Sequence, residues 1–182
     1  MKLMIASDVH GSGYWCERLL EAFDSEQPDK LLLLGDLLYH GPRNPLPDGH
    51  NPKRVAELLS SIKDKLICVR GNCDAEVDQM VLPFPVLADY ALLFLGDKTL
   101  YATHGHLAGP QNPPPLQKGE IMVNGHTHVP CQGVLENGAI YFNCGSVALP
   151  KEDTPHSYLV IENGVVFFKD LESGGIFDSY TL

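Results

Sequence analysis

Five short polar segments hold most of the residues in this chain that could do chemistry. Each contains aspartate, asparagine or histidine, and each directly follows an apolar run typical of a β-strand. The segments are Asp8-Val9-His10, Gly35-Asp36, Gly71-Asn72, His104-Gly105-His106 and Gly125-His126-Thr127-His128. Because ligands bind at the carboxyl ends of strands in an open α/β sheet, we expect the segments to converge on one site.

Together the segments offer two carboxylates, one amide oxygen and up to five imidazoles. Mixed nitrogen and oxygen donors without thiolate suit manganese, iron, cobalt, nickel or zinc, whereas calcium prefers a shell made almost entirely of oxygen. This set exceeds what one ion needs, and a single carboxylate can bridge two ions that lie about 3.5 to 4 Å apart. The sequence therefore predicts a dinuclear divalent-metal site that activates a shared water.

The spacing within two segments predicts how their side chains point. Asp8 and His10 lie two residues apart, so in an extended segment they would project to the same side while Val9 points away. The same alternation applies to His126 and His128. We therefore expect each pair to face the site together.

The first half of the chain alternates strand-like runs with helical periodicity. Strands are predicted at Leu3–Ala6, Leu31–Leu34 and Leu66–Val69. Between them, apolar residues recur at helical spacing from Trp15 to Phe23, and a second helix is predicted to start at Pro52 with Asn51 as its N-cap. This βαβαβ order predicts parallel strands joined by right-handed crossovers.

The second half contains strand-like runs joined mostly by short turns. They are Tyr90–Leu95, Thr99–Thr103, Ile121–Asn124, Gly133–Glu136, Ala139–Asn143, Tyr158–Ile161 and Val165–Lys169. The pairs Asn137-Gly138 and Asn163-Gly164 favour tight hairpins. We expect a single α/β domain over residues 1–182, in which two packed sheets are flanked by helices.

The composition limits the partners. Thirteen lysines and arginines against 23 aspartates and glutamates give a formal net charge of −10, which opposes stable binding to nucleic acid or to an anionic membrane. No apolar run approaches the roughly 20 residues of a membrane span, and no signal-peptide layout is present, so a cytoplasmic protein is expected.

The cysteines are expected to be reduced thiols. Four of them lie in or beside apolar runs and are expected in the packed interior: Cys16, Cys68, Cys131 and Cys144.

The order of the five segments resembles the motif series of the calcineurin-like metallophosphoesterases, and is most similar to their small bacterial and archaeal phosphodiesterases. The resemblance spans essentially the whole chain. It implies a four-layer αββα sandwich built from two packed mixed β-sheets flanked by helices. It also implies a hydrolase of small phosphodiesters that uses two divalent metal ions, most commonly Mn²⁺, with Ni²⁺, Co²⁺, Fe²⁺ and Zn²⁺ as alternatives.

The resemblance further implies how the donors divide. One ion would be bound by Asp8, His10 and His128, the other by Asn72, His104 and His126, and Asp36 would bridge them. Asp74 is expected to orient a ligand rather than to bind metal.

Cys73 departs from the family pattern, which usually has histidine after Gly-Asn as the general acid or as a phosphate-binding group. Two groups remain as donors for the leaving group, the Cys73 thiol and the His106 imidazole. The alternative is a diester whose leaving group needs little protonation. Arg43 and His40, in the loop beyond Asp36, are the candidate substrate-binding residues.

Other functions stay open for this sequence. A phosphomonoesterase would use the same ligands, and the eukaryotic retromer subunit of this fold is a protein-interaction scaffold in which metal ligands have decayed. The complete ligand set favours an enzyme. A nuclease acting on long nucleic acid is disfavoured by the acidic charge. The oligomeric state stays open, and a homo-oligomer is possible.

Overall fold

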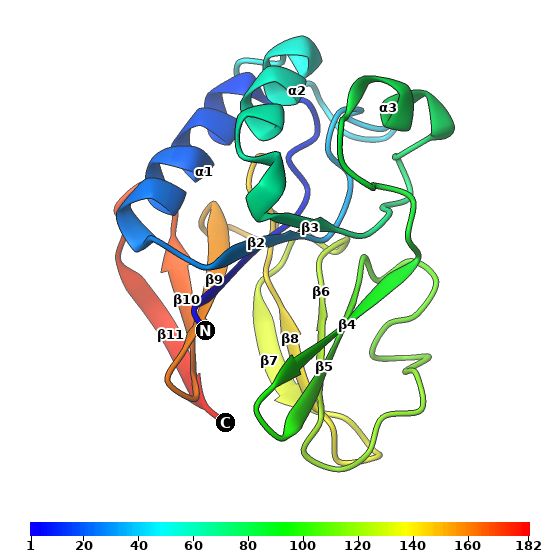
Figure 1. Ribbon diagram of the computed structural model, residues 1–182, viewed down its shortest axis with the longest axis vertical. Coiled ribbons are helices and arrows are strands. Elements are labelled where there is room, and N and C mark those ends of the chain that lie inside the picture. The colour runs from blue at the N-terminus through cyan, green and yellow to red at the C-terminus, as the bar shows by residue number, and fades with distance from the viewer.

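The N-terminal apolar runs form three parallel strands in the computed structural model, which describes residues 1–182. The strands are β1 (Leu3–Ala6), β2 (Lys30–Leu33) and β3 (Leu66–Cys68). β1 pairs with β2 and β2 pairs with β3, and helices connect them (Figure 1). The predicted βαβαβ unit is confirmed.

Polar caps define where the two longer helices begin. In α1 (Gly13–Glu26), the Ser12 hydroxyl accepts a hydrogen bond from the backbone N–H of Trp15 at 3.1 Å. In α2 (Pro52–Ser61), the Asn51 side chain accepts one from the N–H of Arg54 at 3.1 Å, so the predicted cap is confirmed. A 3-10 turn, η1 (Lys63–Lys65), leads into β3. No helix of the structure combines the length and apolarity that crossing a membrane requires.

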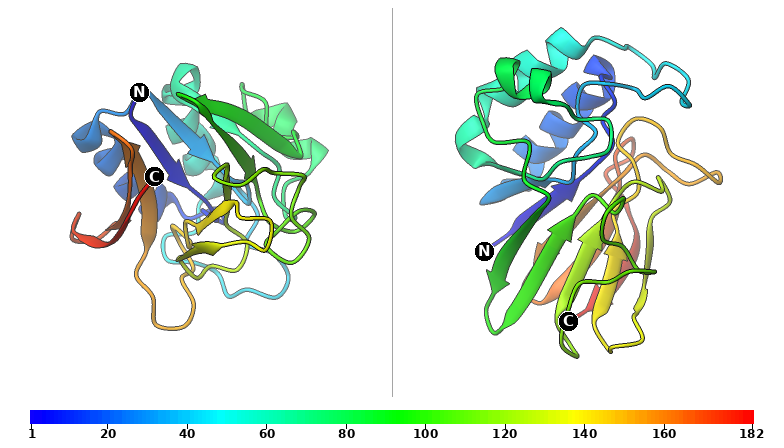
Figure 2. Two further views of the ribbon diagram at one scale, coloured as in Figure 1. Left: turned by 90° about the horizontal axis from the view of Figure 1, so that it is seen from below. Right: turned by 90° about the vertical axis from the view of Figure 1, so that its right-hand side faces the viewer.

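Two mixed sheets make up the body of the molecule (Figures 1 and 2). The six-stranded sheet has the order β11-β10-β9-β1-β2-β3, and the five-stranded sheet has the order β4-β5-β6-β8-β7. The remaining strands are β4 (Tyr90–Leu95), β5 (Lys98–Thr103), β6 (Ile121–Asn124), β7 (Cys131–Val134), β8 (Ile140–Asn143), β9 (Ser157–Glu162), β10 (Val165–Asp170) and β11 (Ile176–Thr181). Each sheet contains parallel and antiparallel pairs.

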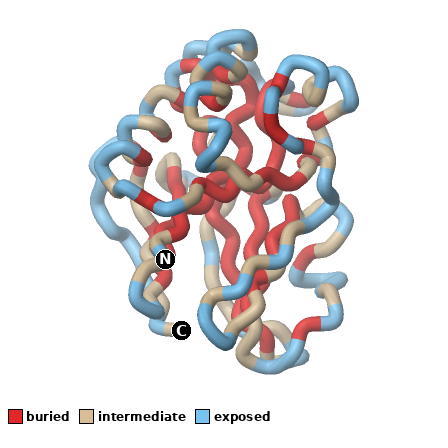
Figure 3. Tube along the Cα trace, viewed as in Figure 1, coloured by how far each residue is buried: buried red, intermediate tan, exposed pale blue.

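Alternate residues of β1 face two different cores. Met4 and Ala6 pack toward α1 and α2, while Leu3 and Ile5 pack toward the five-stranded sheet. The first core holds 22 buried residues and the second holds 16. Figure 3 shows that the buried residues are concentrated in the central strands. The predicted α/β sandwich of two packed mixed sheets is confirmed, and α1 and α2 cover the outer face of the six-stranded sheet. The outer face of the five-stranded sheet carries a small cluster around Leu116, contributed by a loop rather than by a helix.

Several details differ from the sequence prediction. β7 lies at Cys131–Val134 rather than at 133–136, and Cys131 is exposed, so its predicted burial is wrong. The Asn163-Gly164 pair makes the expected tight turn, with positive φ at both residues. The Asn137-Gly138 pair instead lies in the longer connection 135–139.

Apart from the single turn η1, two elements were not predicted, α3 (Glu76–Val81) and the edge strand β11. No residue of α3 is buried, and β11 is almost entirely exposed. Neither element therefore carries the apolar periodicity that marks a helix or strand in sequence.

Candidate metal centre

All five polar segments meet at the carboxyl ends of parallel strands. Asp8 follows β1, Asp36 follows β2 and Asn72 follows β3 in the six-stranded sheet. In the other sheet, His104 follows β5 and the segment of His126 and His128 follows β6, which runs parallel to β5. Packing of the two sheets brings these edges together, as the strand order predicts.

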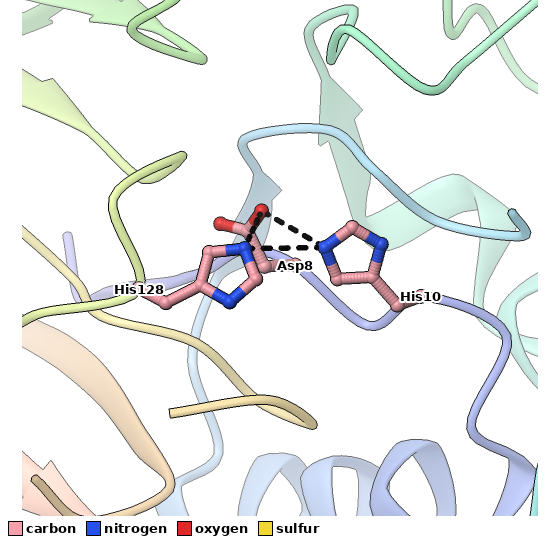
Figure 4. A group of neighbouring side chains, drawn as sticks. All are labelled: Asp8, His10 and His128. Atoms are coloured by element: carbon pink, nitrogen blue, oxygen red, sulfur yellow. Dashed lines mark hydrogen bonds and ion pairs between the residues drawn. The ribbon is translucent and has the colours of Figure 1, made fainter. Parts of the chain in front are cut away.

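Asp8, His10 and His128 form one cluster and point toward one another (Figure 4). Asp8 Oδ1 lies 3.4 Å from His10 Nε2 and 3.2 Å from His128 Nε2. The two imidazole Nε2 atoms are 3.3 Å apart. All three residues are buried. These are the residues that the sequence resemblance assigns to one metal ion.

Asn72, His104 and His126 form a second cluster. His104 Nε2 lies 3.0 Å from Asn72 Oδ1 and 3.2 Å from His126 Nδ1. Asp36 stands between the clusters, because its Oδ2 is 3.5 Å from His104 Nε2 and 3.7 Å from His10 Nε2. This is the position that a bridging carboxylate would occupy.

The hydrogen bonds of the imidazoles fit metal binding. The Nδ1 atoms of His10, His104 and His128 lie 2.9, 2.7 and 2.6 Å from the backbone carbonyls of Tyr39, Leu34 and Leu149. A carbonyl can only accept, so each Nδ1 carries the proton and each Nε2 directs a lone pair into the cluster. Asp8 Oδ1 is buried there and accepts no hydrogen bond. In the neutral form of the imidazoles, lone pairs and carboxylates therefore converge, which is the arrangement that a divalent cation stabilises.

The backbone that presents these ligands is left-handed. The φ angles are 59° at Asp8, 49° at His10, 55° at Asp36, 67° at His126 and 65° at His128. The prediction of extended segments is therefore wrong, although the paired side chains do converge. Each such residue costs about 1 to 3 kcal/mol, and this strain is typical of functional sites.

Asp74 holds two ligand loops together through the backbone. Its Oδ2 accepts hydrogen bonds from the N–H groups of Asp36 and Gly71, both at 2.7 Å, and its Oδ1 accepts one from Leu37 at 2.9 Å. Asp74 is buried and belongs to neither cluster. It therefore sets the spacing between Asp36 and the neighbouring Asn72 loop.

The segment that follows β8, which includes Ser146 and Leu149, supports two metal-ligand candidates but has no recognisable motif in the sequence. The Ser146 hydroxyl donates to the Asp8 carbonyl at 2.9 Å and accepts from the N–H of Leu149, also at 2.9 Å. The carbonyl of Leu149 is in turn the acceptor for His128 Nδ1. This segment thus positions two ligands of the first cluster, but in the sequence it reads only as the tail of an apolar strand.

The Cys73 thiol lies beside the clusters. Its Sγ is grouped with ligand atoms of His10 and Asp36 that lie within 4.8 Å of one another. Burial and then the Asp36 carboxylate raise the pKa of Cys73 to about 12. The side chain is therefore a neutral thiol at neutral pH in the metal-free protein.

A pocket of about 510 Å³ opens above the clusters. It is lined by Asp36, Gly41, Pro42, Arg43, Asn44, Pro45, Asn72, Cys73, His126, Thr127, His128 and Lys151. Arg43, a candidate substrate-binding residue, therefore lies on the pocket wall, and so does Lys151, which the sequence did not suggest.

The two remaining candidates, His40 and His106, do not line this pocket. His40 lines a neighbouring cavity of about 520 Å³ together with Tyr39 and His50, and Cys73 borders both cavities. The ring centroids of His106 and His104 are 5.3 Å apart, but His106 does not line the pocket. Burial, followed by the charge of His104, lowers the pKa of His106.

The protonation of His10 predicts a pH dependence of metal binding. Burial opposes a charge on His10, but the Asp8 carboxylate and the Tyr39 carbonyl outweigh it and raise its pKa. Protons therefore begin to compete with the metal ion at pH values above the ordinary pKa of histidine. The metal affinity should fall by about tenfold for each pH unit below the pKa of His10. Calorimetric titration at several pH values, in buffers of different ionisation enthalpy, should show proton release on binding. A pH-independent affinity between pH 6 and 8, at roughly constant proton count, would contradict this assignment.

Comparison with known proteins gives the family. Residues 1–164 match the model of the calcineurin-like phosphoesterase superfamily domain. The phosphodiesterase YfcE of Escherichia coli K12 is 49% identical over 167 residues, which are 91% of this chain and 90% of YfcE. The probable metallophosphoesterase YsnB of Bacillus subtilis is 24% identical, with 96% and 93% of the two chains covered.

Solved structures agree. The structure of E. coli YfcE, described as a phosphoesterase, superimposes with a TM-score of 0.96 at 45% identity, covering 100% of this chain and 99% of YfcE. A Vps29 mutant from Entamoeba histolytica has a TM-score of 0.65 at 17% identity, with 100% and 99% covered, and shows the fold alone. The chain therefore belongs to the calcineurin-like phosphoesterase superfamily and is a metal-dependent phosphoesterase.

Proposed function

We propose that the protein is a phosphodiesterase that hydrolyses small phosphodiesters at a centre of two divalent metal ions. Residues 1–182 form one domain that supplies the whole site. Asp8, His10 and His128 would hold one ion, Asn72, His104 and His126 would hold the other, and Asp36 would contribute to both. The observation that carries the proposal is the position of Asp36 Oδ2 between His10 and His104, at 3.7 and 3.5 Å from their Nε2 atoms.

The metal ions, when bound, would polarise the phosphoryl oxygens and lower the pKa of a shared water. The chain supplies position and charge. The carbonyls that accept from His10, His104 and His128 fix the ring orientations. The pocket above the ligands leaves room for the ester arms of the substrate. The mixed nitrogen and oxygen donors favour Mn²⁺, with Ni²⁺, Co²⁺, Fe²⁺ and Zn²⁺ as alternatives.

The substrate class is inferred from the lack of a strong proton donor for the leaving group. Cys73 stands where a histidine donor would, and its raised pKa makes it a weak acid. His106 has a lowered pKa and lies beside His104 rather than on the pocket wall, so its neutral form predominates at neutral pH. The site therefore favours diesters whose leaving group needs little protonation. His106 is the alternative donor for less acidic leaving groups.

Removal and restoration of metal tests this proposal. Chelated protein should lose hydrolysis of bis-p-nitrophenyl phosphate, and Mn²⁺ should restore it, because without a divalent ion nothing in the site polarises the phosphoryl oxygens and lowers the pKa of the attacking water. The restored protein should prefer this diester to p-nitrophenyl phosphate. Activity that survives complete chelation would contradict the metal centre. A preference for the monoester would instead indicate a phosphomonoesterase, and inactivity with every divalent ion would favour a scaffold.

A further inference from the structure

Two cations face the pocket above the metal ligands. Arg43 and Lys151 both line it, and Asp36 is the only acidic residue that does so. Their loops, 40–50 and 144–156, project from the same side of the molecule (Figure 2). Neither side chain takes part in an ion pair, although the chain carries a net charge of −10. We call Arg43 and Lys151 the cationic rim.

The loop that carries Arg43 is held in place. Pro42 and Pro45 restrict its backbone, and the Asn44 side chain donates to the His40 carbonyl at 2.9 Å. Gly41, with φ of 81°, approaches the Cys73 thiol so closely that a Cβ would lie 3.0 Å from Sγ. Arg43 is therefore presented to the pocket by a loop with few alternative conformations.

Lys151 is anchored to the metal centre itself. Its backbone N–H donates to the His128 carbonyl at 3.2 Å. Its own carbonyl accepts from the N–H and the hydroxyl of Thr154, at 3.1 and 2.7 Å. The adjacent Glu152 and Asp153 are exposed and do not line the pocket. The positive charge of Lys151 is therefore the one that this loop offers to a ligand.

The cationic rim has no role in balancing the scissile phosphate of a diester. That phosphate carries one negative charge. In the proposed function two divalent ions already face it, and the carboxylates of Asp8 and Asp36 neutralise only part of their positive charge. We propose that the cationic rim binds a second anionic group, a carboxylate or phosphate, on the non-leaving arm of the substrate. The proposal rests on the proposed diesterase activity, and it defines the preferred substrates as diesters with at least one further negative charge.

A matched pair of substrates tests this. Bis-(4-nitrophenyl) phosphate and 4-carboxyphenyl 4-nitrophenyl phosphate share a leaving group, and a carboxylate replaces a nitro group of similar shape on the other arm. The Mn²⁺-loaded wild type should have roughly tenfold higher kcat/KM for the carboxylate compound, because a solvent-exposed ion pair contributes up to about fivefold for each cation. The preference should weaken with added salt.

Substitution separates the rim from the chemistry. Lys151→Gln should lower the preference by about threefold to fivefold through KM for the carboxylate compound, and Lys151→Arg should retain it. Arg43→Gln should act in the same direction. Lys118→Gln is the control, because it removes the same charge from a surface away from this pocket. Calorimetry on metal-free protein, which does not turn over, should show a lower Kd for the carboxylate compound than for bis-(4-nitrophenyl) phosphate.

Each outcome bears on a different claim. Equal kcat/KM for the two diesters, or a Lys151→Gln variant that weakens both equally, would overturn the rim while leaving the diesterase intact. Hydrolysis of neither diester with any divalent ion would overturn the proposed function. The calorimetric comparison would then still decide whether the rim prefers the additional charge.

Discussion

Asp36→Asn is expected to reduce kcat/KM for bis-p-nitrophenyl phosphate by more than about 100-fold. Loss of a residue that only hydrogen-bonds to a metal ligand already lowers metal affinity or activity by about 10- to 100-fold, and Asp36 is a proposed ligand itself. Asp36 is buried, and its Oδ2 lies within 3.7 Å of Nε2 atoms from both clusters. Its Oδ1 accepts from the Cys73 N–H at 2.7 Å. An amide keeps the size but removes the negative charge shared by the clusters. Metal content, measured by elemental analysis, should fall together with turnover.

The control for this variant is Asp24→Asn, which makes the same change at an exposed position of α1. Its kinetics and metal content should match those of the wild type. Circular dichroism of Asp36→Asn should remain native, so that the loss can be assigned to the site. An Asp36→Asn protein with two bound ions and wild-type turnover would exclude Asp36 as the bridge.

Asp74→Ala is expected to destabilise the metal-free protein by about 3 kcal/mol or more. The change leaves the buried N–H groups of Asp36, Leu37 and Gly71 without their acceptor, and each such loss costs about 1 to 3 kcal/mol. For a chain of this size, 3 kcal/mol corresponds to a Tm lower by roughly 6 to 12 °C. Thermal and urea denaturation measure the effect. Activity should fall even well below the Tm, since Asp36 loses its backbone support.

Two other variants provide a comparison for the loss of stability of Asp74→Ala. Asp74→Asn keeps one acceptor oxygen, so its loss of stability should be smaller than that of Asp74→Ala. Asp78→Ala removes a carboxylate that accepts a single backbone bond, from Ala75 at 2.8 Å, and should cost only about 1 kcal/mol. If Asp74→Ala were no more destabilising than Asp78→Ala, Asp74 would not be the link between the two ligand loops.

Much of the fold could be predicted because the buried strands carry their own signal. β1 and β2 are apolar runs whose residues are buried on both faces, and α1 and α2 show helical spacing with polar caps. α3 and β11 bury almost nothing, so no apolar pattern marks them. Cys131 shows the converse, because it sits next to apolar residues in sequence but at an exposed position of β7.

The sequence by itself determined which donors are present and that they follow strands. Donor chemistry is a property of single residues, and the carboxyl ends of parallel strands share one edge. The tertiary structure alone decided the rest. It showed that left-handed turns present Asp8 and His128, that Asp74 acts through three backbone N–H groups, and that Lys151 reaches the pocket. These features depend on distances between segments far apart in the chain, and packing of the two sheets sets those distances.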